Sequence, residues 1–205
     1  ALSSAASDVY KRQFTNGTVC GIMNMMSNII RFSKRKGLLS MQNYVITITR
    51  QFGSRGRDIG IATAKKLGIP LYDRNVLEKE AEEIDSTLHS LVEFSKNGMS
   101  SSGYYKMAYP LGIGSSLKKD RMFEVQSKLV LQHAETENCV IIGRCADYLL
   151  RERENVIRCY IFAPYQARIR NSILTLGLAT AEPQRIIEEV DKARAEYYRS
   201  HTGCE

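Results

Sequence analysis

The feature that most constrains the fold is the stretch ITITRQFGSRGRDIGIATAKKLG, residues 46–68. Alternating β-branched residues predict a strand over 43–49, and a glycine-rich turn follows it. The segment 57–68 places apolar residues near one helical face and ends at Gly68, which predicts a helix with a glycine cap. A strand that turns through glycines into a helix is a setting in which α/β proteins bind phosphate.

The rest of the chain continues the alternation of strands and helices. Further strands are predicted at 69–73, 139–143 and 156–163, and helices at 74–84, 121–137, 145–152, 165–177 and 183–200. Such alternation implies a parallel sheet covered on both faces. Residues 95–120 are rich in Ser, Gly and Tyr, which predicts a long mobile loop or a small insertion.

Length, composition and charge exclude several classes of protein. A chain of 205 residues with 43% hydrophobic residues can bury the core of one α/β domain. No apolar run approaches the length of a membrane span, so no membrane is expected as a partner. Residues 1–40 contribute +5 of the net charge of +7, because they hold six basic residues and one acid. A basic tail is poor evidence for a nucleic-acid-binding body, so no nucleic acid is expected.

The five cysteines indicate the redox environment. They form neither a CxxC pair nor a His/Cys spacing suited to a metal, and three of them lie in apolar surroundings. Buried thiols of this kind fit a reducing compartment better than a disulfide framework does. A cytoplasmic location is therefore expected.

The N-terminal residues 1–40 are set apart from the predicted domain. ALSSAASDVYKRQ, at 1–13, has no periodicity and resembles a translated sequencing adapter. GIMNMMSNIIRFSKRKGLLS, at 21–40, is basic and free of acids, which leaves two interpretations: a transit peptide, or an untranslated leader ahead of a start at Met41. We expect a non-native or disordered leader over 1–40 and the folded domain over 41–205.

The glycine-rich turn agrees only in part with the phosphate-loop pattern G-x-x-x-x-G-K-[ST]. Gly56 fits its second glycine, while Gln51 takes the place of the first, Arg57 that of the lysine and Asp58 that of the Ser/Thr. An arginine still offers phosphate a two-pronged fork, and a carboxylate can hold Mg²⁺ directly or through water. The other interpretation is a strand–turn–helix connection that uses its glycines for geometry alone.

A family resemblance rests on four blocks that occur in order: ITRQFGSRGRDIG, KKLGIPLYDRNVL, VIIGRCADYLL and DKARAEYYRSHTG. Together they resemble the cytidylate kinase-like family, relatives of the P-loop nucleoside monophosphate kinases, over about residues 43–203. The resemblance implies a P-loop kinase-like parallel sheet with helices on both faces, a mobile insertion and a lid. It implies transfer of the γ-phosphoryl group of ATP, with Mg²⁺, to a nucleoside monophosphate such as CMP. Related sequences continue past HTGCE into another strand, which implies a truncated C-terminal end.

The resemblance also implies residue roles. Phosphate binding falls to Gly53, Ser54, Gly56, Arg57 and Asp58. Catalysis by neutralising phosphoryl charge falls to Arg57, Arg168 and Arg170. Contacts with the acceptor fall to Asp73, Arg74, Arg144, Asp191 and Arg194. The candidate metal ligand is Asp58.

Several of these residues have a purely structural alternative. Asp73 could simply cap the helix that follows it. Arg168 and Arg170 could lie on a solvated helix face. Asp191 and Arg194, as i,i+3 neighbours, could form a surface ion pair.

Two departures from the cytidylate kinase pattern affect the acceptor. Cys145 replaces an aspartate beside Arg144, and Ile187 replaces an arginine four residues before Asp191. The second departure leaves cytosine selectivity open. Arg144 itself favours function, because an arginine directly beyond a buried apolar strand needs an anionic partner.

Three functional hypotheses follow. The first is a phosphotransferase acting on small-molecule nucleotides. The second is a nucleotide-binding sensor or pseudokinase without turnover, which the Arg57-Asp58 pair favours. The third is a nucleic-acid-binding or interaction protein, supported mainly by the basic tail. The acceptor and the oligomeric state are not fixed by the sequence.

Overall fold

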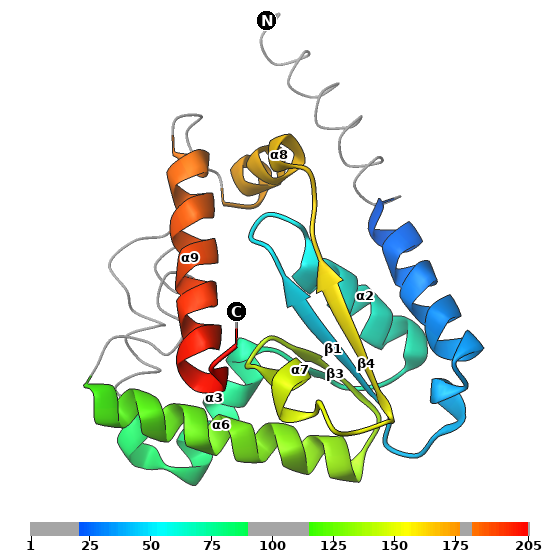
Figure 1. The fold of residues 1–205 in the computed structure, drawn as a ribbon, viewed down its shortest axis with the longest axis horizontal. Helices are drawn as coiled ribbons and strands as arrows, with labels where there is room; N and C mark the ends of the chain where they lie inside the picture. Colours follow the sequence, from blue (N-terminus) through cyan, green and yellow to red (C-terminus); the bar gives the residue numbers. More distant parts are fainter. Residues whose placement is uncertain (1–20, 90–114, 177–181, 205) are drawn as a thin grey trace, which may run out of the picture.

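The computed structural model describes residues 21–89, 115–176 and 182–204. Within them a four-stranded sheet forms the centre of the molecule (Figure 1). Its strands are β1 (Val45–Arg50), β2 (Leu71–Tyr72), β3 (Cys139–Ile142) and β4 (Val156–Ile161). All paired strands are parallel and their order is β2-β3-β1-β4, so β1 is flanked by β3 and β4.

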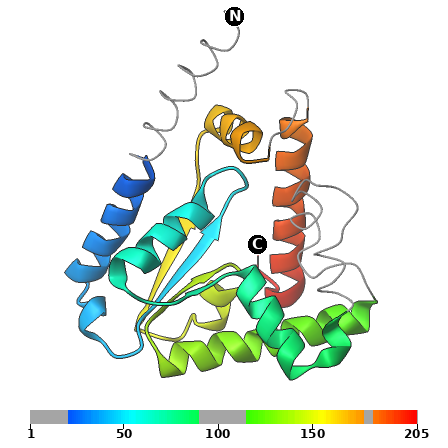
Figure 2. The ribbon, with the colours of Figure 1, turned by 180° about the vertical axis from the view of Figure 1, so that it is seen from behind.

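The helices cover both faces of the sheet. They are α2 (Gly56–Leu67), α3 (Arg74–Ile84), α6 (Ser116–Thr136), α7 (Ala146–Leu149), α8 (Tyr165–Leu176), α9 (Pro183–Thr202) and a helix over 21–35. Short 3-10 turns lie at Leu38–Ser40 and Ser86–Leu88. Figure 2 shows α2 lying across one face of the sheet.

Side-chain alternation along β1 explains how two cores form. Val45 joins the buried cluster that contains residues of α3, α6 and α7, whereas Ile46 and Ile48 join the cluster that contains residues of α2. Successive side chains of a strand point to opposite faces, so one apolar strand supplies both layers. The prediction of an α/β parallel sheet with helices on both faces is confirmed.

The carboxyl ends of the strands point toward α8 and α9. α8 follows β4 beyond this edge, and α9 runs back from it toward α6 (Figure 1). The far end of α9 is fixed by aromatic packing, since His201 stacks on Phe123 of α6 with ring centroids 3.8 Å apart. Both helices therefore stand over the edge where strands pass into helices.

The N-terminal segment, predicted to be a non-native or disordered leader, is described by the structure from residue 21 onward. Residues 21–35 are helical, and the side chains of Met26, Ile29 and Leu38 are buried. Ile29 and Leu38 belong to the same cluster as Ile46. Residues 21–40 thus include a segment that packs on the core, and residues 1–20 lie outside the described part. The boundary at Met41 stays a prediction. Among the described helices, none is both long and apolar enough to cross a membrane.

The predicted elements agree with the structure except at some ends. The predicted strand at 69–73 shrinks to Leu71–Tyr72, preceded by Pro70, which lacks the N–H that a ladder needs. The predicted loop 95–120 lies outside the described residues as far as 114. Its last five residues, 116–120, instead belong to α6, which begins with a cap by the side chain of Ser115.

Candidate functional site

The loop between β1 and α2 ends in a helix N-terminus open to an anion. Among the described residues, no side chain caps α2, and its N-cap residue Arg55 has φ 65°. Uncapped N–H groups and the helix dipole make such an end favourable for phosphate. Asp58, in the first turn, pairs with the side chain of Arg55. The loop has the local features of a phosphate cradle, but its carboxylate already has an ion-pair partner.

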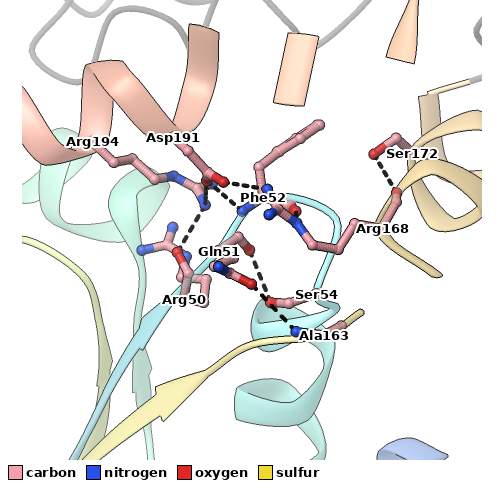
Figure 3. Close-up of polar contacts among 9 residues, drawn as sticks. All are labelled: Arg50, Gln51, Phe52, Ser54, Ala163, Arg168, Ser172, Asp191 and Arg194. Carbon is pink, nitrogen blue, oxygen red and sulfur yellow. Dashed lines mark hydrogen bonds and ion pairs between the residues drawn. The ribbon is translucent and has the colours of Figure 1, made fainter. Parts of the chain in front are cut away.

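Helices α8 and α9 hold the loop from the other side (Figure 3). The N–H of Phe52 donates to Asp191 Oδ1 over 2.7 Å, and Arg168 Nε donates to the Phe52 carbonyl over 2.7 Å. Asn171 Nδ2 donates to the carbonyl of Gly53 over 2.8 Å. A Cβ on Gly53 would lie 2.6 Å from the Arg168 carbonyl oxygen, so this glycine is required for the close approach of α8.

The inner part of the loop is held by its own polar groups. Ser54 Oγ donates to the Gln51 carbonyl over 2.8 Å, and the N–H of Ala163 donates to Gln51 Oε1 over 3.4 Å. Ser54, predicted to bind phosphate, therefore uses its hydroxyl hydrogen within the loop (Figure 3). Its backbone N–H donates to the Gln51 carbonyl over 3.4 Å. Ser54 thus tightens the turn that leads into α2.

Arg57 and Asp73 form an ion pair between the two candidate subsites. Arg57 Nε and Nη2 donate to Asp73 Oδ2 over 2.9 and 2.7 Å. Asp73 Oδ1 accepts from the N–H groups of Asn75 and Val76, so the same carboxylate also caps α3. The Asp73 side chain is buried while that of Arg57 is 55% exposed, which leaves the arginine the partner with more freedom to reorient.

Glu78 lies between two of the predicted acceptor arginines. Its Oε1 pairs with Arg74 and lies 3.6 Å from Nη2 of Arg144. All three side chains are largely buried, at 16% exposed or less. Burial lowers the pKa of Arg74 to about 10, an effect that Arg144 strengthens and Glu78 opposes. The carboxylate neutralises part of this buried positive charge.

The turn after β3 has an unusual backbone. Gly143, Arg144 and Cys145 all have positive φ, at 73°, 59° and 54°. Such conformations cost non-glycine residues free energy and concentrate at functional sites. Cys145 occupies the place of the expected aspartate, and burial raises the pKa of its thiol to about 12. Asp147, the other candidate for that role, accepts from the hydroxyl of Tyr198 over 2.9 Å.

Arg50, the last residue of β1, lies between the two glycine turns. A Cβ on Gly56 would lie 2.6 Å from Arg50 Cβ, and a Cβ on Gly143 would overlap Arg50 Nη1. Burial and the cations Arg194 and Arg144 hold the pKa of Arg50 well below its ordinary value. Through this one side chain, the predicted phosphate turn and the Arg144 turn meet at the same edge of the sheet.

The side chains of Arg194 and Arg170 lie in different surroundings. Arg194 Nη1 donates to the Arg50 carbonyl over 3.1 Å and lies 4.0 Å from Asp191 Oδ1 (Figure 3). Burial lowers the pKa of Arg194. Arg170 is exposed on α8, whereas Arg168 is buried and pairs with Asp191. The two predicted lid arginines are therefore not equivalent.

Most of the predicted site residues gather at one edge of the sheet, with Arg170 the clearest departure. Sequence reasoning missed two residues there, Arg50 and Glu78. The argument applied to Arg144, an arginine at the end of a buried strand, applies equally to Arg50 and would have found it. Glu78 carried a weaker signal, an i,i+4 spacing from Arg74.

The described residues offer no dedicated metal cage. They contain no group of three or more His, Cys, Asp or Glu side chains placed to hold an ion. Mg²⁺ in phosphate-transfer sites is commonly held by one or two carboxylates together with phosphate oxygens. Asp58, at 38% side-chain exposure, fits that arrangement once its pairing with Arg55 is released.

Comparisons with known proteins show which family the chain matches. The sequence model of the cytidylate kinase-like family matches residues 45–205. A solved structure of an uncharacterized protein from Eubacterium ventriosum shares 21% identity at a TM-score of 0.59, over 79% of this chain and 80% of that one. This likeness shows a shared fold. Shikimate kinase from Bacteroides thetaiotaomicron shares 22% identity at a TM-score of 0.44, over 77% of this chain and 82% of that one. No curated protein matches.

Proposed function

Since the chain belongs to the cytidylate kinase-like family, we propose that it is a phosphotransferase that moves the γ-phosphoryl group of ATP to a nucleoside monophosphate such as CMP. The coarser part of this statement, a kinase-like protein that uses nucleotides, rests on the family. The donor, the acceptor and the residue roles are the proposal. Its main support is that Arg50 touches both glycine turns, so the α2 N-terminus and Arg144 share one edge of the sheet.

The donor phosphates bind at the loop of residues 53–58 in this proposal. The uncapped N–H groups of α2 donate hydrogen bonds to phosphate oxygens, and the helix dipole adds attraction. Arg57 leaves Asp73 and presents its fork to the bridging and terminal oxygens. The side chain of Arg57 is 55% exposed and can reorient, and the buried Asp73 carboxylate that it leaves keeps its hydrogen bonds from the N–H groups of Asn75 and Val76.

The acceptor binds beside the turn after β3. Arg144 and Arg74 face each other across Glu78 and provide two cations close to the Asp73 cap. A nucleoside monophosphate brings a dianionic phosphate, which such a pair can bind with charge-assisted hydrogen bonds. The acceptor phosphate itself attacks the γ-phosphorus, so the protein supplies no nucleophile.

Charge neutralisation and alignment are the remaining requirements. Arg168 donates to the loop carbonyl and pairs with Asp191, so it already lies next to the donor loop. An arginine held there neutralises oxygen charge as it develops, and Arg170 can join it only after a movement of α8. When Mg²⁺ is bound, it supplies further neutralisation of the phosphates, with Asp58 as its candidate protein ligand.

A coupled assay of ADP release tests the proposed reaction. Purified protein, ATP and Mg²⁺ are mixed with each of CMP, dCMP, UMP, AMP and GMP, and release without acceptor is subtracted. We expect acceptor-dependent ADP release with at least one monophosphate. The matched control is Arg144→Gln, which should reduce acceptor-dependent release while leaving ATP binding by calorimetry close to that of the parent.

The same experiment separates the alternative function. A nucleotide-binding sensor or pseudokinase would bind ATP in calorimetry and release no ADP with any acceptor. The pairing of Asp58 with Arg55 and of Phe52 with Asp191 gives that alternative its support, because both engage groups that a phosphate loop would present. Absence of both binding and turnover would refute both hypotheses.

A further inference from the structure

Arg50 has no role among those that the family resemblance implies, although it lies in one of the blocks that carry the resemblance. It ends the central strand β1, and its stem packs against the position of Gly56, with 3.0 Å between Arg50 Cγ and a Cβ built there. Its guanidinium lies over Gly143, whose own Cβ would overlap Nη1 and lie 3.6 Å from Cζ. Glycine at both positions leaves the room that this side chain occupies.

The guanidinium of Arg50 has no hydrogen-bond or ion-pair partner in the described part of the chain. This sets it apart from the neighbouring arginines, since Arg57, Arg168 and Arg194 all donate to protein oxygens. As a residue, Arg50 is partly buried and not fully enclosed. A guanidinium with five unused donors, lying between two turns of the site, can donate hydrogen bonds to an oxyanion without first giving up a protein contact.

The charges around Arg50 are mainly positive. Four charged side chains act on it: Arg194, Arg144 and Arg57, which are cations, and Asp73, which is an anion. Asp73 is already paired with Arg57, so it does little to neutralise the others. Glu78 and Asp191 offset part of the charge of Arg144 and Arg194. The positive charge that remains around Arg50 is repulsive, and an anion bound there relieves that repulsion.

We propose that Arg50, together with the neighbouring cations Arg144 and Arg194, forms an oxyanion-binding site for a phosphate group. A phosphate carries up to two negative charges and enough oxygens to accept from several guanidinium groups at once. The inference rests on the proposed function only for the source of that group, a nucleoside triphosphate or a nucleoside monophosphate. The presence of an oxyanion site follows from the geometry and charge of Arg50 alone.

The test compares Arg50→Gln with Arg50→Lys and with a control, Arg151→Gln. Gln keeps the Cβ and Cγ atoms that pack on Gly56, Lys keeps the charge without the fork, and Arg151 is an exposed arginine paired with Glu152. Calorimetry at constant ionic strength measures the binding of ATP alone, CMP alone and inorganic pyrophosphate alone. We expect Arg50→Gln to weaken binding of at least one of them about tenfold or more, with Arg50→Lys in between.

The pattern across the ligands identifies the source of the phosphate. If Arg50→Gln loses affinity only for ATP and pyrophosphate, the site belongs to the donor. If it loses affinity only for CMP, the site belongs to the acceptor. Melting curves without ligand provide a second readout. Because Arg50 lies among other cations, Arg50→Gln should melt at the temperature of the parent or above it.

Failure of this inference can be told apart from failure of the proposed function. Binding that depends on Arg50 without any ADP release keeps the site and removes the kinase reaction. ADP release with equal affinities in Arg50→Gln and Arg151→Gln overturns the site and keeps the reaction. A ligand-free Arg50→Gln that melts many degrees below the parent would make Arg50 a structural residue and also overturn the site. A parent protein that binds none of the three ligands would likewise overturn the proposed site.

Discussion

The backbone N–H of Phe52 donates a hydrogen bond of 2.7 Å to the carboxylate of Asp191, which lies 139 residues later on α9. The same carboxylate pairs with Arg168 of α8, and Arg168 in turn donates to the Phe52 carbonyl over 2.7 Å. Both polar backbone groups of one loop residue are thus held by two helices from the C-terminal part of the chain. The shape of the glycine-rich loop therefore depends on where α8 and α9 lie (Figure 3).

Asp191→Asn should destabilise the protein. The substitution removes the charge that neutralises Arg168, whose side chain is only 8% exposed, and so leaves a buried cation poorly paired. We expect the free energy of unfolding in urea to fall by about 1–3 kcal/mol. Glu189→Gln is the control, because the side chain of this α9 residue is 42% exposed and pairs with Arg185 in a surface ion pair that contributes little to stability. An equal decrease in the free energy of unfolding in the two variants would contradict this account of the loop.

Local chemistry made several elements predictable from the sequence. The helix predicted at 74–84 has the observed bounds of α3, because Asp73 caps it with hydrogen bonds to the N–H groups of Asn75 and Val76. The strand at 139–143 was predictable because an apolar run of that length suits a strand buried on both faces. In both cases the information lies within a few residues of the element.

The contacts that shape the site are not local, and here sequence reasoning was incomplete. Asp191 and Arg194 were placed at the acceptor through family resemblance, yet they also bind the backbone of Phe52 and Arg50. No periodicity can indicate such contacts, because the chain separation exceeds 130 residues. The acceptor role of both residues stays a prediction.

Leu38→Ala tests whether the N-terminal segment is part of the fold. Leu38 is 2% exposed and packs in the cluster of Ile46 and Ile59, so truncation should leave a cavity. We expect a loss of about 2–4 kcal/mol in the free energy of unfolding, measured in urea. Phe32→Ala, at a side chain that is 51% exposed, should change it by less than about 0.5 kcal/mol. If Leu38→Ala is also neutral, the original prediction of a leader outside the fold holds.

The buried thiols should make stability depend on alkaline pH. Burial raises the pKa of Cys139 and Cys145 to about 12, from an ordinary value of 9.0. Above pH 9 the unfolded chain loses these protons while the folded protein keeps them, so the free energy of unfolding falls as the pH rises from about 9 toward 12.

Thiol labelling provides the direct measurement. At pH 8, peptide mapping after a brief treatment with a thiol reagent should show modification of the exposed Cys204 and protection of Cys139 and Cys145. All three should react after denaturation. In Cys139→Ala the decline of stability between pH 9 and 11 should be shallower than in the parent. Rapid labelling of Cys139 in the native protein would show that this strand opens readily.

Arg57→Ala should weaken the binding of nucleoside triphosphate by about 1–3 kcal/mol, the range for a charge-assisted contact. Lys65→Ala is the control on the same helix, because Lys65 is exposed in the last turn of α2. Asp58→Ala should leave binding without metal unchanged and remove the effect of Mg²⁺. Calorimetry with ATP and with a non-hydrolysable analogue, each with and without Mg²⁺, measures these effects. Unchanged affinity in Arg57→Ala would leave Arg57 only its pairing with Asp73.

Gly56→Val should abolish nucleotide binding, and the structure changes the reason for that prediction. The phosphate-loop interpretation by itself implies that a side chain at this position would block an approaching phosphate. The closest neighbours of a Cβ there are protein atoms, with Arg50 Cβ at 2.6 Å and Ile161 Cβ at 3.3 Å. These atoms belong to β1 and β4, two paired strands that cannot easily move apart.

The two reasons predict different stabilities without ligand. If packing against Arg50 is decisive, Gly56→Ala should already lower the free energy of unfolding by about 1–3 kcal/mol and weaken ATP binding as well. If only the path of the phosphate matters, Gly56→Ala should keep its stability and lose binding alone. Gly21→Ala is the control, since a Cβ there meets nothing within 4 Å. We expect Gly56→Ala to lose both stability and affinity for ATP. Displacing Arg50 disturbs the contact of this side chain with the Gly143 turn and so separates the two halves of the site.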